Sequence, residues 1–110
     1  MVNLFGPKVP EIDVQTLKEM MDSGESFVLL DVRDPDEFEQ MNIPGAVLLP
    51  LGELQDRVGE LDPQAKTVVM CLSGGRSARA TEFLMKQGFR DVCNLKGGIL
   101  AWQQLQQNPC

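Results

Sequence analysis

TVVMCLSGGRS, residues 67–77, is the stretch that decides the fold. A β-branched run ending in Cys71, then two glycines and residues that suit a helix from Ser77, predicts a strand, a tight loop and a helix start. In that geometry the loop N–H groups and the positive end of the helix dipole face the cysteine sulfur. A thiol held there ionises more easily than a free one, and the thiolate is the nucleophile. The segment therefore predicts a reactive cysteine.

The alternative is a small buried core cysteine, which is the commoner fate of an unpaired cysteine. Gly74 and Gly75 count against this alternative, because a loop whose amides all turn inward needs the freedom of glycine. Arg76 and Arg79 lie at the expected helix start, where each cation is disfavoured by roughly 0.3–1 kcal/mol, so we expect them to face an anion. We therefore favour a reactive Cys71.

Length and composition limit the class of protein. A chain of 110 residues with 43% apolar and 24% charged residues predicts one soluble domain with a single core. The net charge of −6 argues against nucleic acid or an anionic membrane as a partner. No apolar run approaches the ~20 residues that span a bilayer, and residues 1–10 do not resemble a signal peptide. We therefore expect a cytoplasmic protein with no membrane segment.

The chain has three cysteines and no histidine. The odd cysteine count and the absence of a C-x-x-C pair argue against a disulfide framework, and so few ligands argue against a zinc site. Without histidine, Ser–His–Asp and Cys–His catalysis are excluded. We expect no metal and no cofactor, and any cysteine chemistry must use a thiolate stabilised by backbone dipoles and arginine.

Strands and helices are expected to alternate on both sides of the central segment. Strands are expected at 27–31, 46–49, 67–70 and 92–95. Helices are expected at 14–21 with Asp13 as the cap, from Asp34 with Glu37 in a capping box, at 51–61, at about 77–87 and after the glycines at 97–98. This alternation predicts an α/β sandwich with a mostly parallel sheet. In such folds the ligand lies beyond the C-terminal ends of the strands, where Cys71 stands.

Four motifs follow one another along the chain. They are LDVR with EF (30–33 and 37–38), IPGA (43–46), CLSGGRS (71–77), and LKGGI with AW (95–99 and 101–102). Together they resemble the single-domain rhodaneses, the thiosulfate sulfurtransferase family, over about residues 10–103. The resemblance implies a three-layer α/β/α sandwich with a five-stranded, mostly parallel sheet. It leaves residues 1–9 as an N-terminal extension and 104–110 as a C-terminal tail.

The resemblance also implies an activity. Cys71 is the catalytic residue, which takes a sulfane sulfur from a donor such as thiosulfate and holds it as a persulfide. The acceptor is cyanide, a thiol or a protein, so the implied partners are a small sulfur-containing anion and a sulfur acceptor, with the oligomeric state open. The amides of the loop cradle the persulfide as an oxyanion hole does; this loop comprises Leu72, Ser73, Gly74, Gly75, Arg76 and Ser77. Arg76 holds the donor anion or braces the loop, and Ser77 supplies a hydroxyl donor.

Three charged residues have supporting roles at the expected site. Asp31 and Arg33 lie at the end of a strand, and Arg79 lies in the first turn of the helix after the loop. For Arg33 we favour an ion pair with Glu37 that braces the strand-to-helix turn, because an unpaired, partly buried charge is costly. Asp31 and Arg33 are therefore expected to support the site rather than to contact the substrate.

Cys93, Cys110 and Trp102 are expected to lie outside the chemistry. Cys93 falls within an expected strand and is taken as inert. Cys110 ends a polar tail and is taken as a bystander thiol. Trp102 is expected to pack in the core rather than to line the site.

Two other classes of protein compete with a sulfurtransferase. Cell-cycle phosphatases and arsenate reductases share the fold, but their loops have five residues between cysteine and arginine, whereas this loop has the four residues 72–75. A shorter loop has one amide fewer and fits a sulfur better than a phosphoryl group. The other class is a non-catalytic rhodanese-like module that binds a partner protein or carries sulfur. Retention of Cys71, both glycines and Arg76 favours activity over this alternative.

Overall fold

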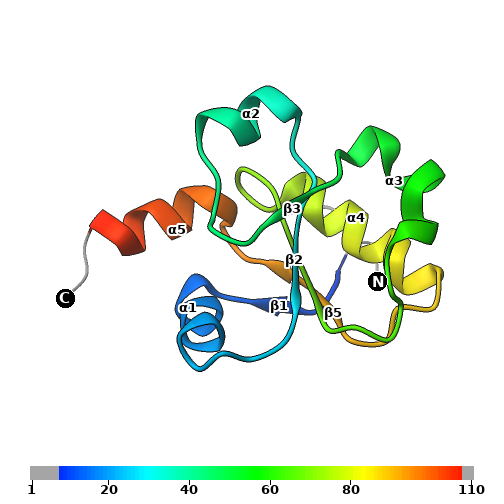
Figure 1. Cartoon of the computed structure of the whole chain (residues 1–110), viewed down its shortest axis with the longest axis horizontal. Helices are drawn as coiled ribbons and strands as arrows, with labels where there is room; N and C mark the ends of the chain where they lie inside the picture. The colour runs from blue at the N-terminus through cyan, green and yellow to red at the C-terminus, as the bar shows by residue number, and fades with distance from the viewer. Residues whose placement is uncertain (1–7, 108–110) are drawn as a thin grey trace.

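The sheet has five strands that all run parallel, in the order β1-β5-β4-β2-β3. The structure is a computed structural model that describes residues 8–107. The strands are β1 (Glu11–Ile12), β2 (Val28–Asp31), β3 (Val47–Leu48), β4 (Thr67–Met70) and β5 (Val92–Leu95). Residue 71 follows β4, the central strand, so the loop begins at the middle of the C-terminal edge of the sheet (Figure 1).

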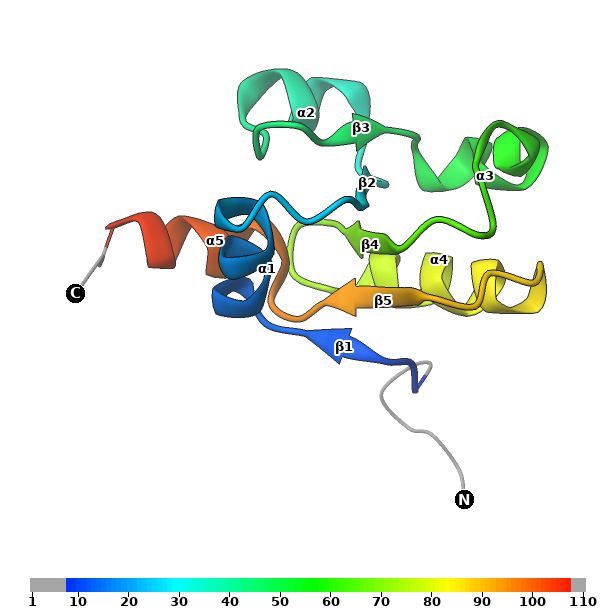
Figure 2. The same cartoon turned by 60° about the horizontal axis from the view of Figure 1, so that its bottom comes forward.

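Helices cover both faces of this sheet. They are α1 (Val14–Asp22), α2 (Pro35–Gln40), α3 (Leu51–Arg57) with a 3₁₀ turn at Val58–Glu60, α4 (Gly75–Lys86) and α5 (Gly98–Gln107). α1 packs beside α5 on one side of the strands, and α3 packs beside α4 on the other (Figures 1 and 2). The predicted three-layer α/β/α sandwich with a five-stranded parallel sheet is confirmed.

The core consists of two apolar clusters, one on each face of the sheet. Successive side chains of a strand point to opposite faces, so Leu30 and Val69 join the cluster under α3 and α4, whereas Leu29 and Val68 join the cluster under α1 and α5. β2 and β4 are thus buried on both faces, as their continuous apolar runs predict. Trp102 packs against the second cluster while remaining partly exposed.

Two helix caps agree with the sequence. The Asp13 carboxylate accepts the Thr16 N–H at 2.8 Å and begins α1. Glu37 Oε1 accepts the Asp34 N–H at 3.0 Å, which is one half of the predicted capping box. These contacts span three residues each and were therefore visible in the local pattern.

Other boundaries differ from the prediction. α4 begins at Gly75, two residues early, because Gly74 takes φ +115° and turns the chain directly into the helix. β1 was not predicted from its residues, because a strand of two residues is too short to show an alternating apolar and polar pattern. α5 extends through Gln107. Residues 104–107, which were expected to belong to the C-terminal tail, are therefore helical. Cys110 lies outside the described residues.

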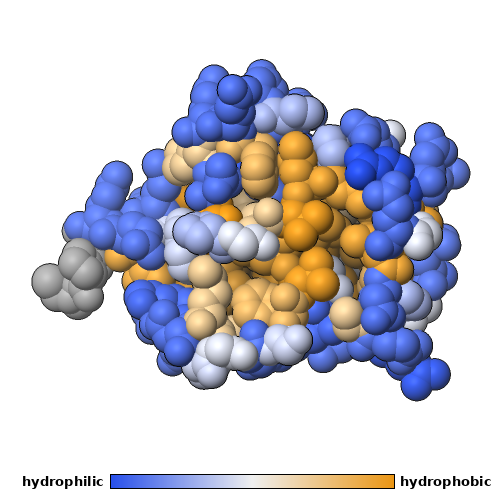
Figure 3. Space-filling view, viewed as in Figure 1, coloured by the Kyte–Doolittle hydropathy of each residue, from blue (hydrophilic) through white to orange (hydrophobic). Residues whose placement is uncertain are grey.

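Apolar surface gathers at the centre of one face, in the region of β3, and polar side chains surround it (Figure 3). Val47 of this edge strand is 51% exposed. β3 has only two residues, which keeps the unpaired edge of the sheet short. Within residues 8–107, no helix has both the length and the apolar character needed to cross a membrane.

Candidate functional site

Three hydrogen-bond donors converge on the sulfur of Cys71. Its Sγ accepts the N–H of Gly74 at 3.1 Å, the N–H of Ser77 at 3.4 Å and the hydroxyl of Ser77 at 3.2 Å. These donors come from the loop and from the first turn of α4, whose dipole is positive at this end. The predicted cradle therefore forms around the sulfur.

The cradle encloses the thiol as well. Cys71 is 1% exposed, while Leu72, Ser73 and Gly75 of the loop above it are exposed. Burial alone would describe a core cysteine, but an ordinary core cysteine has apolar neighbours and no ring of inward N–H groups. The donors distinguish this sulfur from a packing residue.

Burial raises the pKa of the Cys71 thiol, and the hydrogen bonds oppose it. The Ser77 hydroxyl lowers the pKa, as do the backbone N–H groups of Ser77, Gly74 and Ser73. The net pKa lies below its ordinary value. For Cys93, burial raises the pKa and no hydrogen bond compensates. Cys71 is buried and Cys93 is partly buried, and only Cys71 is made more acidic.

Glycine at position 74 is required by its backbone angle rather than by crowding. Its φ of +115° lies in a region that L side chains rarely adopt, although a Cβ there would meet its nearest atom, Gly97 N, at an ordinary 3.6 Å. The Gly74 carbonyl accepts a hydrogen bond from Asn94 Nδ2 at 3.2 Å. Asn94 of β5 thus holds the turn that aims the Gly74 N–H at the sulfur.

The N-terminus of α5 holds the other end of the loop. The N–H groups of Ile99 and Leu100 donate to the carbonyls of Cys71 and Leu72 at 3.0 and 3.2 Å. Gly98 packs so closely beneath them that a Cβ would overlap both carbonyl oxygens, and its φ is +59°. The Gly97-Gly98 doublet is visible in the sequence, but its role in holding the loop was missed there.

Arg76 faces a protein carboxylate rather than a substrate. Its guanidinium pairs with Glu37 through two contacts, at 2.8 and 3.0 Å. The hydrogen bond from Arg76, with a second from the Asp34 N–H, lowers the pKa of Glu37 to about 2. The anion that Arg76 faces in this structure is thus the Glu37 carboxylate, and the pair ties α4 to α2. Glu37 lies 39 residues away in sequence, so local patterns could not reveal this partner.

The predicted ion pair between Arg33 and Glu37 is wrong. Arg33 instead pairs with Asp31, with Nε to Oδ1 at 3.0 Å and Nη2 to Oδ2 at 2.8 Å. Both side chains are buried, and Arg33 also donates to the Met41 carbonyl at 2.7 Å. Arg33 pairs with Asp31 because it lies only two residues after Asp31, the last residue of β2, whereas Glu37 pairs with Arg76. This pair braces the turn after β2 without contacting the sulfur.

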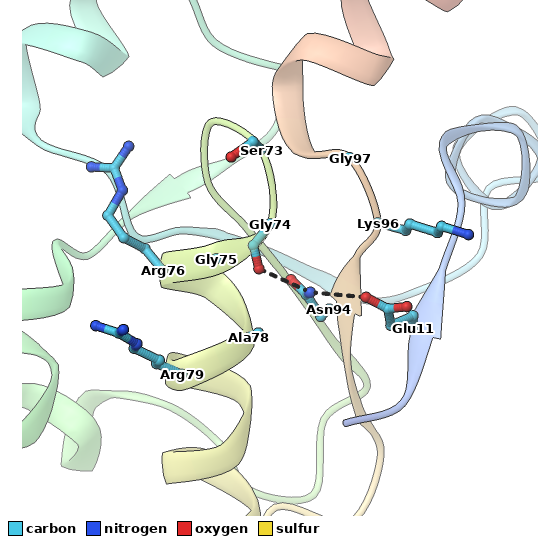
Figure 4. Close-up of a pocket in the computed structure, with 10 residues that line it drawn as sticks. All are labelled: Glu11, Ser73, Gly74, Gly75, Arg76, Ala78, Arg79, Asn94, Lys96 and Gly97. Atoms are coloured by element: carbon cyan, nitrogen blue, oxygen red, sulfur yellow. Dashed lines mark hydrogen bonds between the residues drawn. The ribbon is translucent and has the colours of Figure 1, made fainter. Parts of the chain in front are cut away.

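A surface hollow of about 500 Å³ lies against the outer side of the loop (Figure 4). Its lining comprises Glu11, Ser73, Gly74, Gly75, Arg76, Ala78, Arg79, Asn94, Lys96 and Gly97. Arg79 and Lys96 make no ion pair with any residue that the structure describes. The hollow therefore combines these two cations, which make no such ion pair, with the Glu11 carboxylate and the backbone of the cradle.

The structure brings together most, but not all, of the expected site residues. Ser73, Gly74, Gly75, Arg76 and Arg79 line the hollow, with Ser77 against the sulfur behind them. Leu72, Asp31 and Arg33 lie outside its lining. Asn94, Lys96 and Glu11 were missed, since nothing in a short strand signals which of its side chains faces a loop from elsewhere in the chain.

Comparison with known proteins agrees with this geometry. A family profile described as Rhodanese-like domain matches residues 13–105. A putative sulfur carrier protein of Bacillus subtilis is 42% identical over 94 residues, which cover 86% of this chain and 51% of that protein. A sulfurtransferase of Allochromatium vinosum is 40% identical over 94 residues, covering 86% of this chain and 88% of that protein.

Solved structures give the same result. A rhodanese-related protein of Thermoplasma volcanium matches with a TM-score of 0.79 and 32% identity, covering 86% of this chain and 91% of that one. The chain spans about half the length of the Bacillus relative and most of the Allochromatium and Thermoplasma proteins. On sequence and on structure, the chain belongs to the rhodanese-like domain family.

Proposed function

We propose that this protein is a sulfurtransferase that carries a sulfane sulfur as a persulfide on Cys71. The observation that supports it most is the convergence of the Gly74 N–H, the Ser77 N–H and the Ser77 hydroxyl on Sγ. Fixed donors of this kind stabilise a localised negative charge without reorganising. They suit the Cys71 thiolate that begins the transfer.

The reaction consists of two displacements on sulfur. The Cys71 thiolate attacks the outer sulfur of thiosulfate, the S–S bond of the donor breaks, and sulfite leaves with the bonding electron pair. Cys71 now carries Cys–S–S⁻. Cyanide or an acceptor thiolate attacks the outer sulfur, the persulfide S–S bond breaks, and the thiolate of Cys71 is regenerated. Neither step is expected to need a histidine base, because the hydrogen bonds at Sγ lower the pKa of Cys71 and favour its thiolate.

The donor is expected to be an anion that first binds in the hollow. Arg79 and Lys96 supply unneutralised positive charge there, whereas the charge of Arg76 is neutralised by Glu37. Cys71 is enclosed, so the exposed loop residues Leu72 and Ser73 must move aside for the donor sulfur to reach Sγ. The donor is therefore a small anion rather than a bulky one.

Mass spectrometry of the intact protein tests the proposal. Protein incubated with thiosulfate should gain the mass of one sulfur atom, and cyanide should remove it with release of thiocyanate. The Cys71→Ser variant should gain nothing, whereas the matched Cys93→Ser control should load as the parent does. If the parent gains no sulfur from thiosulfate or from a small persulfide donor, the proposal is wrong.

A further inference from the structure

Ser77 has one hydroxyl hydrogen and two acceptors for it. Its Oγ lies 3.2 Å from Cys71 Sγ and 2.5 Å from Asn94 Oδ1. All three residues are buried, at 0%, 1% and 1% exposure for Ser77, Cys71 and Asn94. Because a hydroxyl donates one hydrogen, Ser77 can donate to the sulfur or to the amide oxygen, but not to both at once.

The other contacts of Asn94 determine which of its atoms faces Ser77. Its Nδ2 donates to the Gly74 carbonyl at 3.2 Å and to Glu11 Oε2 at 3.3 Å (Figure 4). A carbonyl and a carboxylate only accept, so the nitrogen must lie on that side and Oδ1 must face Ser77. Asn94 therefore presents an acceptor that competes with the sulfur.

We propose that Asn94 is a positioning residue that competes with Cys71 for the Ser77 hydroxyl hydrogen, so that Ser77 donates to the sulfur only while the sulfur is charged. In the thiol form, the Cys71 S–H donates to Ser77 Oγ and the hydroxyl donates to Asn94. When the thiol proton leaves for water, the hydroxyl turns to Sγ and Asn94 Oδ1 loses that hydrogen bond. Asn94 thus stabilises the thiol relative to the thiolate.

This competition has a use if Cys71 is the nucleophile, and in that respect it rests on the proposed function. A thiolate whose pKa is lowered too far becomes a weaker nucleophile, and the best attacking thiol has a pKa near the ambient pH. In a persulfide the negative charge moves to the outer sulfur, so the hydroxyl returns to Asn94. The hydrogen bond from Ser77 to Asn94, which is lost in the thiolate, is thereby restored, and this stabilises the persulfide relative to the thiolate.

Several charged groups lie on the elements around Sγ. They are Arg76 and Arg79 on α4, Lys96 after β5, Glu11 on β1, Asp31 and Arg33 at the end of β2, and Glu37 on α2. Changes at Asn94 and Ser77 remove none of these groups, and the loss of the hydrogen bond from Asn94 to Glu11 is common to both Asn94 variants. In a comparison of four proteins that differ only at these two positions, the effect of these charges on the pKa of Cys71 therefore cancels.

The test is a double-mutant cycle on the pH dependence of alkylation. The rate of Cys71 alkylation by iodoacetamide, a neutral reagent, is followed by peptide mapping in the parent, Asn94→Leu, Ser77→Ala and the double variant. Asn94→Leu, which is of similar size and has no acceptor, should lower the pKa of Cys71 relative to the parent. Hydrogen bonds to charged groups suggest a shift of about one pH unit. The same change made in the Ser77→Ala variant should produce no such lowering.

The outcomes separate the competition from simple support of the loop. If Asn94 only holds the Gly74 carbonyl, its removal shifts the pKa of Cys71 equally in the parent and in the Ser77→Ala variant, and equal shifts overturn the proposal.

Asn94→Ala repeats the cycle should Asn94→Leu fold poorly. Thr81→Val is the matched control, since its hydroxyl is equally buried but donates to the Ser77 carbonyl at 2.8 Å; it should leave the pKa of Cys71 within about 0.3 pH unit of the parent. Alkylation does not require sulfur transfer, so failure of the proposed function would not alter this readout.

Discussion

Cys71 and Cys93 show how neighbouring atoms decide what a buried thiol does. Cys71 directly follows β4 and Cys93 lies in the neighbouring β5, and burial raises the pKa of each. Hydrogen bonds from Ser77 and the loop amides reverse this effect at Cys71 alone. Cys71 is therefore expected to ionise at a lower pH than Cys93.

The buried pair of Asp31 and Arg33 is expected to be essential for stability. Asp31→Asn removes the charge and leaves the Arg33 guanidinium, only 3% exposed, without its counter-ion. We expect a loss of about 3 kcal/mol in the free energy of unfolding, measured by urea denaturation. The exposed pair of Lys18 and Asp22 provides the control, and Lys18→Gln should cost less than about 0.5 kcal/mol. Equal losses in the two variants would contradict this role of the buried pair.

At the scale of elements, the loop depends on close packing against the start of α5. Gly98→Ala places a methyl group where the Cys71 and Leu72 carbonyls lie, in a backbone conformation that alanine disfavours. We expect slower alkylation of Cys71 at neutral pH and a loss of about 1–3 kcal/mol in stability. Gly52→Ala in α3 is the control, because a Cβ there meets nothing within 4 Å. A Gly98→Ala protein with parental Cys71 reactivity would show that this contact does not shape the cradle.

The ion pair between α2 and α4 gives a pH-dependent contribution to stability. The pKa of Glu37 falls from an ordinary 4.5 to about 2 in the folded protein. A lowered carboxyl pKa adds stability that is complete above pH 4.5 and is lost as the pH falls towards 2. Because both side chains are about one-third exposed, we expect Glu37→Gln to cost about 1 kcal/mol at neutral pH.

Urea unfolding of the parent and of Glu37→Gln, at several pH values, measures this contribution. The difference between the two proteins should shrink below pH 4.5 and disappear near pH 2. Glu82→Gln is the control, since the Glu82 to Lys86 contact is long, at 3.9 Å, and exposed. A difference that stays constant across the acid range would exclude the ion pair as its source.

The elements also show which features of the structure can be predicted from the sequence. β4 and β5 have the predicted bounds. The Asp13 cap and the Glu37 side of the Asp34 capping box were predictable because these contacts act within one turn. The partner of Arg76 and the role of Asn94 depend on contacts across 39 and 17 residues, which no local pattern contains. The cysteine loop was predictable because strand, loop and helix start are contiguous.

For the whole molecule, a net charge of −6 surrounds a hollow that carries two unpaired cations. For the proposed anionic donor, Arg79 and Lys96 provide local attraction within a protein of negative net charge. Arg79→Gln should therefore raise KM for thiosulfate severalfold with little change in kcat, as expected when binding alone is weakened. Arg90→Gln makes the same change in net charge outside the hollow and should have little effect. Similar kinetics in the two variants would show that Arg79 does not attract the donor.

Peptide and hydroxyl donors are expected to keep one sulfur ionised near neutral pH without histidine, and the proposed chemistry depends on this. The most direct test is an ultraviolet titration of thiolate absorbance, taken as the difference between the parent protein and Cys71→Ser. We expect a midpoint below that of an ordinary free thiol, and below the midpoint obtained in the same way for Cys93. A midpoint for Cys71 at or above that of Cys93 would contradict it.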